Sequence, residues 1–392
     1  MTEPSPGKSK RPRPLVVDVH VPAESHSYPV LIGRGTISRL GAELLQRLGH
    51  SGTVALVSDS TVAPLHAGAV QANLAAQGFT VVPIVIPAGE AHKTTGTLLE
   101  VVGAMIASGM GRRDAVIALG GGVVGDLAGL AAALFMRGVP VVQCPTTLLS
   151  QVDASVGGKV AVDAPAGKNM IGAFHFPLFV VIDPELLATL GNRELTQGLA
   201  EMLKHALLFS ADHLAALLAA APAIHARNFD VITPLVATSV GLKAACVGRD
   251  PWETGEAGKG RVLLNLGHTI GHAIEAASGF QVAHGEAVAL GLRAAARISE
   301  LKGIAQPGLE ALVVDALTRL RLPTGLDEWL VGDRGAAVER ALLIDKKRAA
   351  GSVSYVALGG VGEPSVLPLA LRDLMGLLRQ RVGADGPGKH LS

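Results

Sequence analysis

The chain has 392 residues, which is enough for two domains and a large buried core. Hydrophobic residues make up 49% of it and charged residues 17%, and this composition excludes a disordered chain. The 34 lysines and arginines against 33 aspartates and glutamates leave a net charge of +1. This balance gives no reason to expect a nucleic acid or an anionic membrane as a partner.

The ends of the chain and the two cysteines favour a cytoplasmic protein. Residues 1–14, MTEPSPGKSKRPRP, lack the apolar stretch of a secretory signal, and we expect them to form a disordered tail, as we do for 382–392. The most membrane-like segment, 115–135, contains five glycines and an aspartate, which favours strand and loop over a membrane span. Cys144 and Cys246 lie in apolar surroundings and are expected to be buried thiols in a reducing compartment.

Secondary-structure patterns divide the chain near Gly191. Before it, β-branched runs alternate with Ala- and Leu-rich stretches, with predicted strands at 53–57, 80–86, 114–119, 139–143 and 178–182. After it, helical runs dominate, at 193–209, 213–221, 234–247, 263–278 and 287–302, and only 352–357 has the composition of a strand. We therefore expect an α/β domain with a Rossmann-like parallel sheet over 15–190 and a mostly α-helical domain over 191–381.

The strand predicted at 114–119 runs into Gly120-Gly121-Gly122-Val123-Val124-Gly125-Asp126 and then into an Ala-rich helix. This has the form G-x-G-x-x-G, in which glycines allow a close backbone approach and the helix start offers free N–H groups to an anion. The acidic residue usually found about twenty positions later is absent, so a plain tight turn explains this motif equally well. Two further strand ends, at Asp59 and at 87–93, carry polar loops and favour a nucleotide crevice at the carboxyl edge of the sheet.

Histidines and a glutamate predict a metal site in the second half. His268 and His272 are four residues apart on a predicted helix and share a face, and His284 begins the next helical run. Glu201 and Lys204 share a face of another helix. Two histidines, one carboxylate and an open position are typical of catalytic zinc. These residues leave open which two histidines bind, and an ion pair on a solvated face remains the alternative for Glu201 and Lys204.

Basic and amide side chains occur in four Gly-rich or apolar segments, at 155–159, 167–172, 261–265 and 345–347. A lysine beside glycines in a loop can turn inward to a phosphate. Taken singly, each lysine is better explained as a surface residue. Four such segments in one chain, together with a nucleotide crevice and a metal, favour a small polyanionic substrate.

Together these segments resemble the 3-dehydroquinate synthases, in their bacterial single-enzyme form. The similarity runs from Tyr28 to Ala370 and rests on motifs at 119–128, 145–159, 167–174, 198–204, 264–275 and 284–289. The resemblance implies conversion of the phosphorylated sugar acid 3-deoxy-D-arabino-heptulosonate 7-phosphate to 3-dehydroquinate and phosphate, the second step of the shikimate pathway. It also implies NAD, which is reduced and regenerated in every turnover, and one divalent metal, zinc or cobalt.

The resemblance further implies the residues of the site. The metal would be held by Glu201, His268 and His284. NAD would contact Asp59, Glu90, Lys93, Gly121, Gly122, Val123, Asp126, Thr146, Thr147 and Lys168. The substrate would contact Asp153, Lys159, Asn169, Lys204, Lys243, Arg261, Asn265 and Lys346. Proton transfer would involve His272 and Glu253, with Lys159, Lys204 and Asp153 as further catalytic residues. Arg137 would reach into the site of a neighbouring subunit, which implies a homodimer.

Other functions have recognisable signatures. A sister sugar-phosphate cyclase would alter several substrate positions, whereas this chain keeps the dehydroquinate synthase identities at Asn169, Lys243, Arg261, Asn265 and His272. A metal-dependent polyol dehydrogenase would accumulate NADH and would not need basic residues around a phosphate. A non-enzymatic NAD-binding protein would be inactive with metal and NAD bound. The segment 255–260, just before Arg261, is a few residues longer than is usual in the family.

Overall fold

The computed structural model describes residues 27–165, 167–254, 260–346 and 352–381. The tails predicted at 1–14 and 382–392, and most of the long segment at 255–260, lie outside the described residues. So does the side chain of Lys346, whose backbone is the last residue of α11 (Gly332–Lys346).

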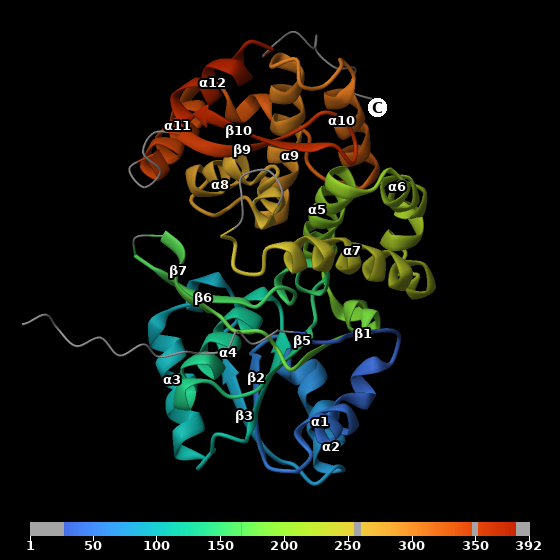
Figure 1. The fold of residues 1–392 in the computed structure, drawn as a ribbon, viewed down its shortest axis with the longest axis vertical. Helices are drawn as coiled ribbons and strands as arrows, with labels where there is room; N and C mark the ends of the chain where they lie inside the picture. Colours follow the sequence, from blue (N-terminus) through green and yellow to red (C-terminus); the bar gives the residue numbers. More distant parts are fainter. Residues whose placement is uncertain (1–26, 166, 255–259, 347–351, 382–392) are drawn as a thin grey trace, which may run out of the picture.

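A parallel six-stranded sheet is the centre of the N-terminal part, with the spatial order β1-β8-β5-β4-β2-β3 (Figure 1). β4 and β8 are buried along their whole length, as expected for apolar strands that are covered on both faces. The strands are β1 (Val30–Ile32), β2 (Thr53–Asp59), β3 (Thr80–Ile86), β4 (Ala115–Gly120), β5 (Val141–Pro145) and β8 (Phe179–Ile182). The predicted parallel sheet is confirmed, and the edge strand β1 is an addition to the prediction.

Two pairs of helices cover the sheet because side chains alternate along each strand. Val54 and Leu56 of β2 pack with α1 (Leu40–Leu48) and α2 (Gly68–Ala75) on one face. Ala55 and Val57 point to the other face, where they pack with α3 (Thr95–Ala107) and α4 (Gly122–Leu134). The carboxyl ends of the strands are therefore the open edge of this layered structure.

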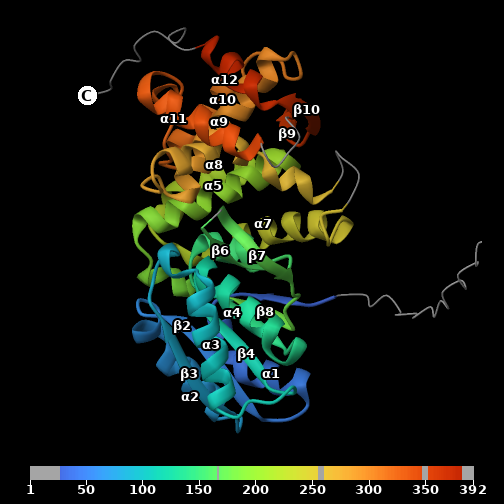
Figure 2. The same cartoon turned by 90° about the vertical axis from the view of Figure 1, so that its left-hand side faces the viewer.

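An antiparallel hairpin, β6 (Lys159–Ala164) and β7 (Gly167–Phe174), lies at the boundary between the α/β part and the helical part (Figures 1 and 2). Val160 and Val162 belong to the core formed with α3 and α4, whereas most of β7 is exposed. The strand over 167–174 was not among those predicted. Its glycines and lysine are uncommon in strands, so composition does not identify β7, which is a strand because it pairs with β6.

The C-terminal part is mostly helical and is built around α9, which is buried along most of its length. β9 (Ser352–Leu358) and β10 (Pro364–Ala370) form a second antiparallel hairpin, of which only β9 was predicted. The remaining helices are α5 (Asn192–Phe209), α6 (Ala211–His225), α7 (Phe229–Arg249), α8 (His268–Ala277), α9 (His284–Leu301), α10 (Leu309–Arg319), α11 and α12 (Leu371–Arg379).

The helix predicted over 263–278 is interrupted. A 3-10 turn at Arg261–Asn265 precedes α8, and Gly267 separates them with a φ of 79°. A Cβ atom at Gly267 would lie 2.9 Å from the backbone nitrogen of Leu292 on α9. Glycine thus allows both the left-handed turn and the close contact between α8 and α9, and this contact sets where α8 begins.

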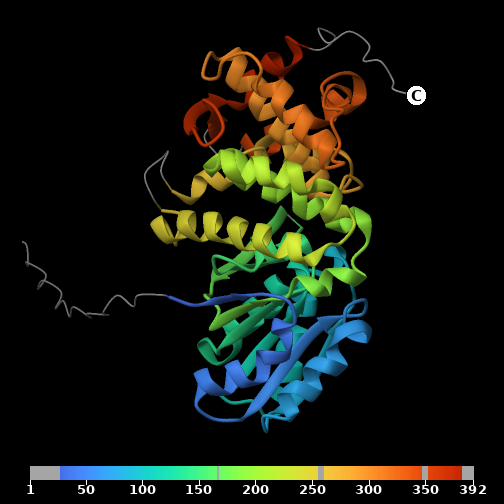
Figure 3. The same cartoon turned by 90° about the vertical axis from the view of Figure 1, so that its right-hand side faces the viewer.

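Helix α7 is, among the described helices, the one that is long and apolar enough to cross a membrane, by length and composition only. It contributes Ile232, Leu235, Val236 and Val240 to the core of the helical part. Figure 3 shows it in olive, lying across the molecule between the two parts. Because core helices of soluble proteins pass the same test, α7 is here a packing element that joins the two parts.

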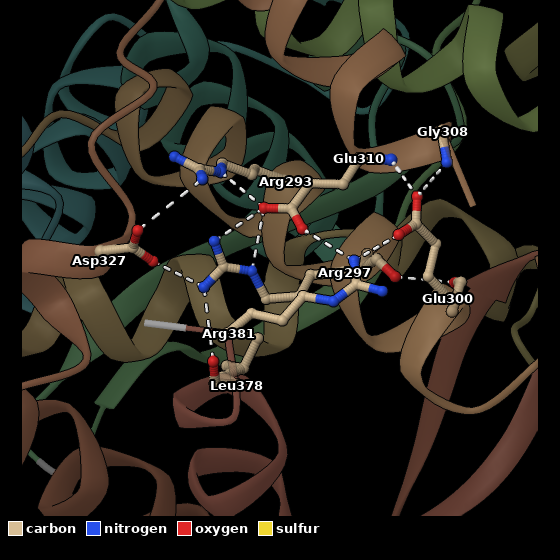
Figure 4. Close-up of polar contacts among 10 residues, drawn as sticks. Arg293, Arg297, Glu300, Gly308, Glu310, Asp327, Leu378 and Arg381 are labelled. Carbon is tan, nitrogen blue, oxygen red and sulfur yellow. Dashed lines mark hydrogen bonds and ion pairs between the residues drawn. The ribbon is translucent and has the colours of Figure 1, made fainter. Parts of the chain in front are cut away.

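A network of ion pairs ties α9 to α10 and to the end of α12 (Figure 4). Arg297 is fully buried on α9, and its guanidinium donates to Glu310 at 2.8 and 2.9 Å and to Asp327 at 2.6 Å. Arg293 donates to the same oxygen of Glu310 at 2.9 Å. Arg381, just after α12, pairs with Glu300 at the other end of the network. The charges are paired within the network, so its buried cations are compensated.

Candidate metal and cofactor site

Three ligand atoms converge where α5, α8 and α9 meet. His268 is the first residue of α8 and His284 the first of α9, and each Nε2 atom lies 3.5 Å from Oε1 of Glu201 on α5. Lys204 pairs with the other oxygen, yet neither carboxylate oxygen of Glu201 accepts a hydrogen bond within the described part of the chain. A buried carboxylate without hydrogen bonds is costly. A divalent cation between the three ligand atoms would compensate it, so these residues fit a metal.

The other nitrogen of each imidazole is already engaged. Nδ1 of His268 lies 3.1 Å from the carbonyl oxygen of Leu266, and Nδ1 of His284 lies 3.5 Å from Oε2 of Glu275. These acceptors favour a proton on Nδ1, so Nε2, which faces Glu201, is the nitrogen that a metal would take in place of a proton. The donor set is that of an open catalytic zinc site, with two imidazoles and one carboxylate.

Charges around the cluster shift its pKa values in opposite directions. Burial, helped by the Lys204 cation, lowers the pKa of His268 to about 3, so its imidazole is neutral. Burial alone would lower the pKa of His284, but Glu201 and Glu275 outweigh it and raise that pKa to about 9. Burial would raise the pKa of Glu201, but Lys204 and the histidines outweigh it and hold that pKa far below its usual range. The carboxylate is thus ionised and attracts a cation.

His272 lies beside this cluster on an exposed part of α8. Its ring centroid is 5.1 Å from that of His268 and 5.9 Å from that of His284. Desolvation by the surrounding residues and the neighbouring His284 lower its pKa below the ordinary value. His272, Glu275 and His284 form a second group of potential ligands, and Asp153, Glu201 and His205 a third. Glu201 belongs to the third group as well, but Asp153 in that group already pairs with Lys243. In the group of Glu201, His268 and His284, two imidazole nitrogens face the same carboxylate oxygen, and we therefore take it as the candidate metal site.

Behind the cluster, buried lysines surround a carboxylate. Nζ of Lys243 lies 2.8 Å from Oδ1 of Asp153, and Nε2 of His205 lies 3.7 Å from the same oxygen. Burial would raise the pKa of Asp153, but Lys243 and Lys204 outweigh it and hold that pKa well below its usual range. Lys204 and Lys243 are themselves buried. This arrangement keeps two cations in an apolar setting next to the metal cluster, where they are suited to an anionic ligand.

The remaining predicted substrate residues line a more open side. Lys159, at the start of β6, forms an ion pair with Glu253, and both side chains are partly exposed. Arg261 is buried, and its Nη1 donates to the carbonyl oxygens of Gly157 at 2.8 Å and Pro251 at 3.1 Å. Asn265 is exposed at the end of the 3-10 turn. Lys159 is therefore accessible, whereas the guanidinium of Arg261 is partly engaged by backbone.

The predicted cofactor loop is the junction of β4 and α4. Gly121 is the N-cap of α4, and Gly122 and Val123 form its first turn, so their free N–H groups lie at the open edge of the sheet. Thr146 and Thr147 follow the neighbouring strand β5. The hydroxyl of Thr146 is buried and has no hydrogen-bond partner among the described residues. An unpaired hydroxyl beside a helix N-terminus fits a ligand that supplies hydrogen bonds there.

Charged residues continue from this loop to the hairpin. Nζ of Lys93 lies 2.5 Å from Oδ2 of Asp126 on α4 and also donates to Oδ1 of Asn169 on β7. Burial raises the pKa of Asp126 to about 6, although Lys93 opposes this. Nζ of Lys168 lies 3.5 Å from Oε1 of Glu90. Lys93, Asp126 and Asn169 are thus in contact, and Lys168 joins Glu90 beside them.

Two predicted residues lie apart from these contacts. Oδ1 of Asp59 accepts hydrogen bonds from the backbone nitrogens of Thr61 at 2.8 Å and Val62 at 2.9 Å, so it caps the turn after β2. Arg137 is exposed at the far end of α4, and a 13-residue helix of about 20 Å separates it from the cofactor loop. Arg137 therefore does not reach this chain's own cluster.

Two sequence profiles match the chain, 3-dehydroquinate synthase N-terminal over residues 83–197 and 3-dehydroquinate synthase C-terminal over residues 198–348. A curated 3-dehydroquinate synthase from Pelobacter propionicus is 44% identical over 353 residues, which cover 90% of this chain and 96% of that protein. The chain belongs to the 3-dehydroquinate synthase family.

Solved structures show the same architecture. A 2-epi-5-epi-valiolone synthase from Streptomyces hygroscopicus subsp. jinggangensis, solved with NAD+ and Zn2+, is 28% identical, has a TM-score of 0.82, and is matched over 93% of this chain and 99% of that one. A 2-deoxy-scyllo-inosose synthase, solved with carbaglucose-6-phosphate, NAD+ and Co2+, is 24% identical with a TM-score of 0.76, over 90% and 96% of the two chains. The second likeness shows the fold alone. Both agree with the predicted dehydroquinate synthase-like fold.

Two residues of this 3-dehydroquinate synthase family site were not assigned a role from the sequence. Glu275 follows His268 by seven positions and His272 by three, so helical spacing places it on the same face of α8, and this signal was available. His205 follows Lys204 directly, but its Nδ1 lies 2.8 Å from Oγ of Ser239 on α7, a long-range contact without a sequence signal. Both cysteines are buried and unpaired, as predicted.

Proposed function

We propose that the chain is a 3-dehydroquinate synthase that uses catalytic NAD and one divalent metal, zinc or cobalt. Family membership supports the reaction, and one observation supports the site. The ionised carboxylate of Glu201 is buried without hydrogen bonds, opposite the Nε2 atoms of His268 and His284 and beside the buried cation of Lys204. Burying these charged groups costs free energy, and binding a cation and an anionic substrate together would offset that cost.

Glu201, His268 and His284 are the proposed metal ligands. The bound ion would supply Lewis-acid polarisation of a substrate hydroxyl, and NAD would accept a hydride and return it. The chain holds these groups on different elements: the ligands are on α5, α8 and α9, whereas the cofactor loop lies between β4 and α4. The substrate would lie between the two parts, where closely packed elements exclude water.

The cations near the metal ligands are proposed to bind the substrate's anionic groups. Lys204 and Lys243 are held in place by Glu201 and Asp153 and would face a carboxylate together with Arg261. Lys159 is exposed and paired with Glu253, so a phosphate would compete with that carboxylate for the ammonium group. The further substrate contacts proposed are Asn169, Asn265 and Lys346.

Proton transfer is assigned to His272, with Glu253 as a second acceptor. The lowered pKa of His272 keeps its imidazole neutral, as a proton acceptor must be. Its exposed position allows a proton to pass to solvent. Glu253 lies with Lys159 on the open side, where a carboxylate can take a proton as the phosphate leaves.

The remaining assignments concern the cofactor and the assembly. NAD would contact the first turn of α4 and the polar strand ends beside it: Asp59, Glu90, Lys93, Gly121, Gly122, Val123, Asp126, Thr146, Thr147 and Lys168.

The domains are proposed to be 15–190 and 191–381, since α5 begins at Asn192. Arg137 is exposed away from its own cluster, which supports a role in the site of a second subunit in a homodimer. A cytoplasmic location agrees with two unpaired thiols.

The reaction is tested by measuring phosphate and NADH together. The protein is mixed with 3-deoxy-D-arabino-heptulosonate 7-phosphate, Zn2+ and less than one equivalent of NAD. We expect many equivalents of phosphate to be released per NAD, without NADH build-up, and no release when NAD is omitted or the metal is chelated. Steady NADH formation from polyols with no phosphate release would contradict the proposal and indicate a dehydrogenase.

A further inference from the structure

Glu275 touches both parts of the molecule. It is nearly buried on α8, with 5% of its surface exposed. One carboxylate oxygen lies 3.5 Å from Nδ1 of His284, and the other lies 2.6 Å from Nζ of Lys168 on the β6–β7 hairpin. His284 belongs to the metal cluster of the helical part, whereas Lys168 comes from the α/β part. A single carboxylate therefore bridges two elements that the fold brings together.

Lys168 is held by the helical part through a second contact. Its Nζ atom lies 4.8 Å from the ring centroid of Phe280, in the turn after α8. An ammonium group over an aromatic face is attracted by the ring. On its other side Lys168 lies 3.5 Å from Glu90, a residue of the proposed cofactor site. Its position thus depends on Glu275 and Phe280 from one part and on Glu90 from the other.

The same hairpin also contacts the cofactor loop. Asn169 follows Lys168 directly and accepts a hydrogen bond from Lys93, which pairs with Asp126 on α4. Polar contacts therefore run from Asp126 through Lys93 to Asn169, and from its chain neighbour Lys168 through Glu275 to His284. A change in the position of the hairpin at one end of these contacts alters the acceptor that orients the imidazole at the other end.

We propose that Glu275 is a positioning residue that couples metal binding to NAD binding. It orients His284 for the metal and holds Lys168 against the cofactor, so that each ligand strengthens the binding of the other. This inference rests on the proposed function, because it assumes that both ligands bind. By thermodynamic linkage, the factor by which NAD raises zinc affinity equals the factor by which zinc raises NAD affinity.

The test measures zinc affinity of the metal-free enzyme by competition with a chromophoric chelator, with and without saturating NAD. For the unchanged protein we expect NAD to raise zinc affinity by about 5-fold or more. Glu275→Gln keeps the shape of the side chain but loses its charge. Without NAD its zinc affinity should fall by about 10- to 100-fold, and the effect of NAD should vanish.

Glu286→Gln is the matched control. Glu286 is also close to His284 in sequence, but its carboxylate faces Arg193 on the surface at 2.7 Å. The Glu286→Gln variant should retain both the zinc affinity of the unchanged protein and the dependence of that affinity on NAD. Circular dichroism of each metal-free variant shows whether the fold is intact, and Glu275→Asp serves if Glu275→Gln does not fold, because its shorter side chain cannot reach both partners.

The outcomes separate the two proposals. If the unchanged protein binds neither zinc nor NAD, the proposed function fails. If it binds both, but NAD does not change the zinc affinity, or Glu275→Gln behaves as the unchanged protein does, the coupling role of Glu275 is overturned and the proposed function stands. Equal loss of NAD dependence in Glu286→Gln would also overturn it, since any charge change near His284 would then suffice.

Discussion

Helix α9 carries two charged clusters that differ in one respect. At its N-terminus, His284 faces Glu201, whose carboxylate oxygens accept no hydrogen bond within the described chain. Three turns later, Arg297 is equally buried but donates to Glu310 and Asp327 at normal hydrogen-bond distances (Figure 4). The first cluster is incomplete, whereas the second is satisfied by the chain itself. Buried charge by itself therefore does not indicate a site in this molecule, whereas buried carboxylate oxygens that accept no hydrogen bond do.

The difference also concerns where the partners come from. Arg297 takes its partners from neighbouring helices and loops of the helical part, so the second cluster stabilises that part alone. Glu201 of α5 instead faces histidines at the first positions of α8 and α9, so the first cluster joins the starts of two helices to a third. Changes in the first cluster should affect ligand binding, and changes in the second should affect stability.

The largest effect is expected from the metal ligands. His268→Ala removes one of the three proposed ligand atoms and should abolish detectable metal binding and activity together. His272→Ala removes an imidazole of the same helix face whose role is proton transfer, and it should keep the metal while activity falls by about 100-fold or more. Metal content after dialysis, measured by mass spectrometry, and phosphate release check both variants. Equal metal loss in the two variants would refute the ligand assignment.

A smaller loss, this time of stability, is expected in the second cluster. Arg297→Met fills the space but leaves Asp327 with only a 3.9 Å contact to Arg293, and it weakens the pairing of Glu310. We expect the free energy of unfolding to fall by about 3 kcal/mol, the lower end for a broken buried pair, because Arg293 still pairs with Glu310. Urea unfolding followed by circular dichroism measures this change. Zinc affinity and turnover of the folded variant should be those of the unchanged protein.

The control is an exposed arginine in the same part of the chain. Arg334 pairs with Glu328 at 2.7 Å, and both side chains are more than half exposed. Arg334→Met should cost less than about 1 kcal/mol. If Arg297→Met reduced zinc affinity as strongly as it reduced stability, the two clusters would not be independent and the contrast between them would be lost.

The sequence predicts the main architecture of this molecule because the relevant signals are local. β-branched runs before residue 191 and helical periodicity after it identify the parallel sheet and the helical part. The errors occur where tertiary contacts decide. β7 is a strand in spite of its glycines because it pairs with β6. Gly267 interrupts the helix predicted over 263–278 because α9 lies against it. Strand β10 begins with proline and contains another, which hid its pairing with β9.

For the site, the residues alone predict a metal, a nucleotide and an anionic substrate, but not the partners of each group. Helical spacing places His268, His272 and Glu275 on one face of α8, yet it does not show that His268 turns toward Glu201 or that Glu275 reaches Lys168. Those contacts join α8 to α5 and to the hairpin, separated from it by tens of residues. Only the resemblance to a family selects among the three histidines at the level of the sequence.

The smallest effect concerns Asp126, a carboxylate on the cofactor side. Burial raises its pKa from 3.8 to about 6, although Lys93 lies 2.5 Å away. An acid whose pKa is higher in the folded state destabilises the fold as it ionises, so this cost develops between about pH 4 and pH 6 and is complete at pH 7. Relative to Asp126→Asn, the unchanged protein should therefore lose about 1–3 kcal/mol of stability from pH 4 to pH 7, measured by urea unfolding without NAD.

The direction in which the stability difference between the unchanged protein and Asp126→Asn changes with pH allows the same comparison in the α/β part. If instead the ion pair with Lys93 outweighed burial, the unchanged protein would gain stability over Asp126→Asn as the pH rises. Asp315→Asn, on an exposed turn of α10 with its carboxylate 3.8 Å from Arg319, is the surface control, and its stability is measured over the same pH range. A loss of stability with rising pH would show that burial outweighs the ion pair with Lys93 at the cofactor loop, in contrast to Glu201, whose pKa is lowered by Lys204 and the histidines.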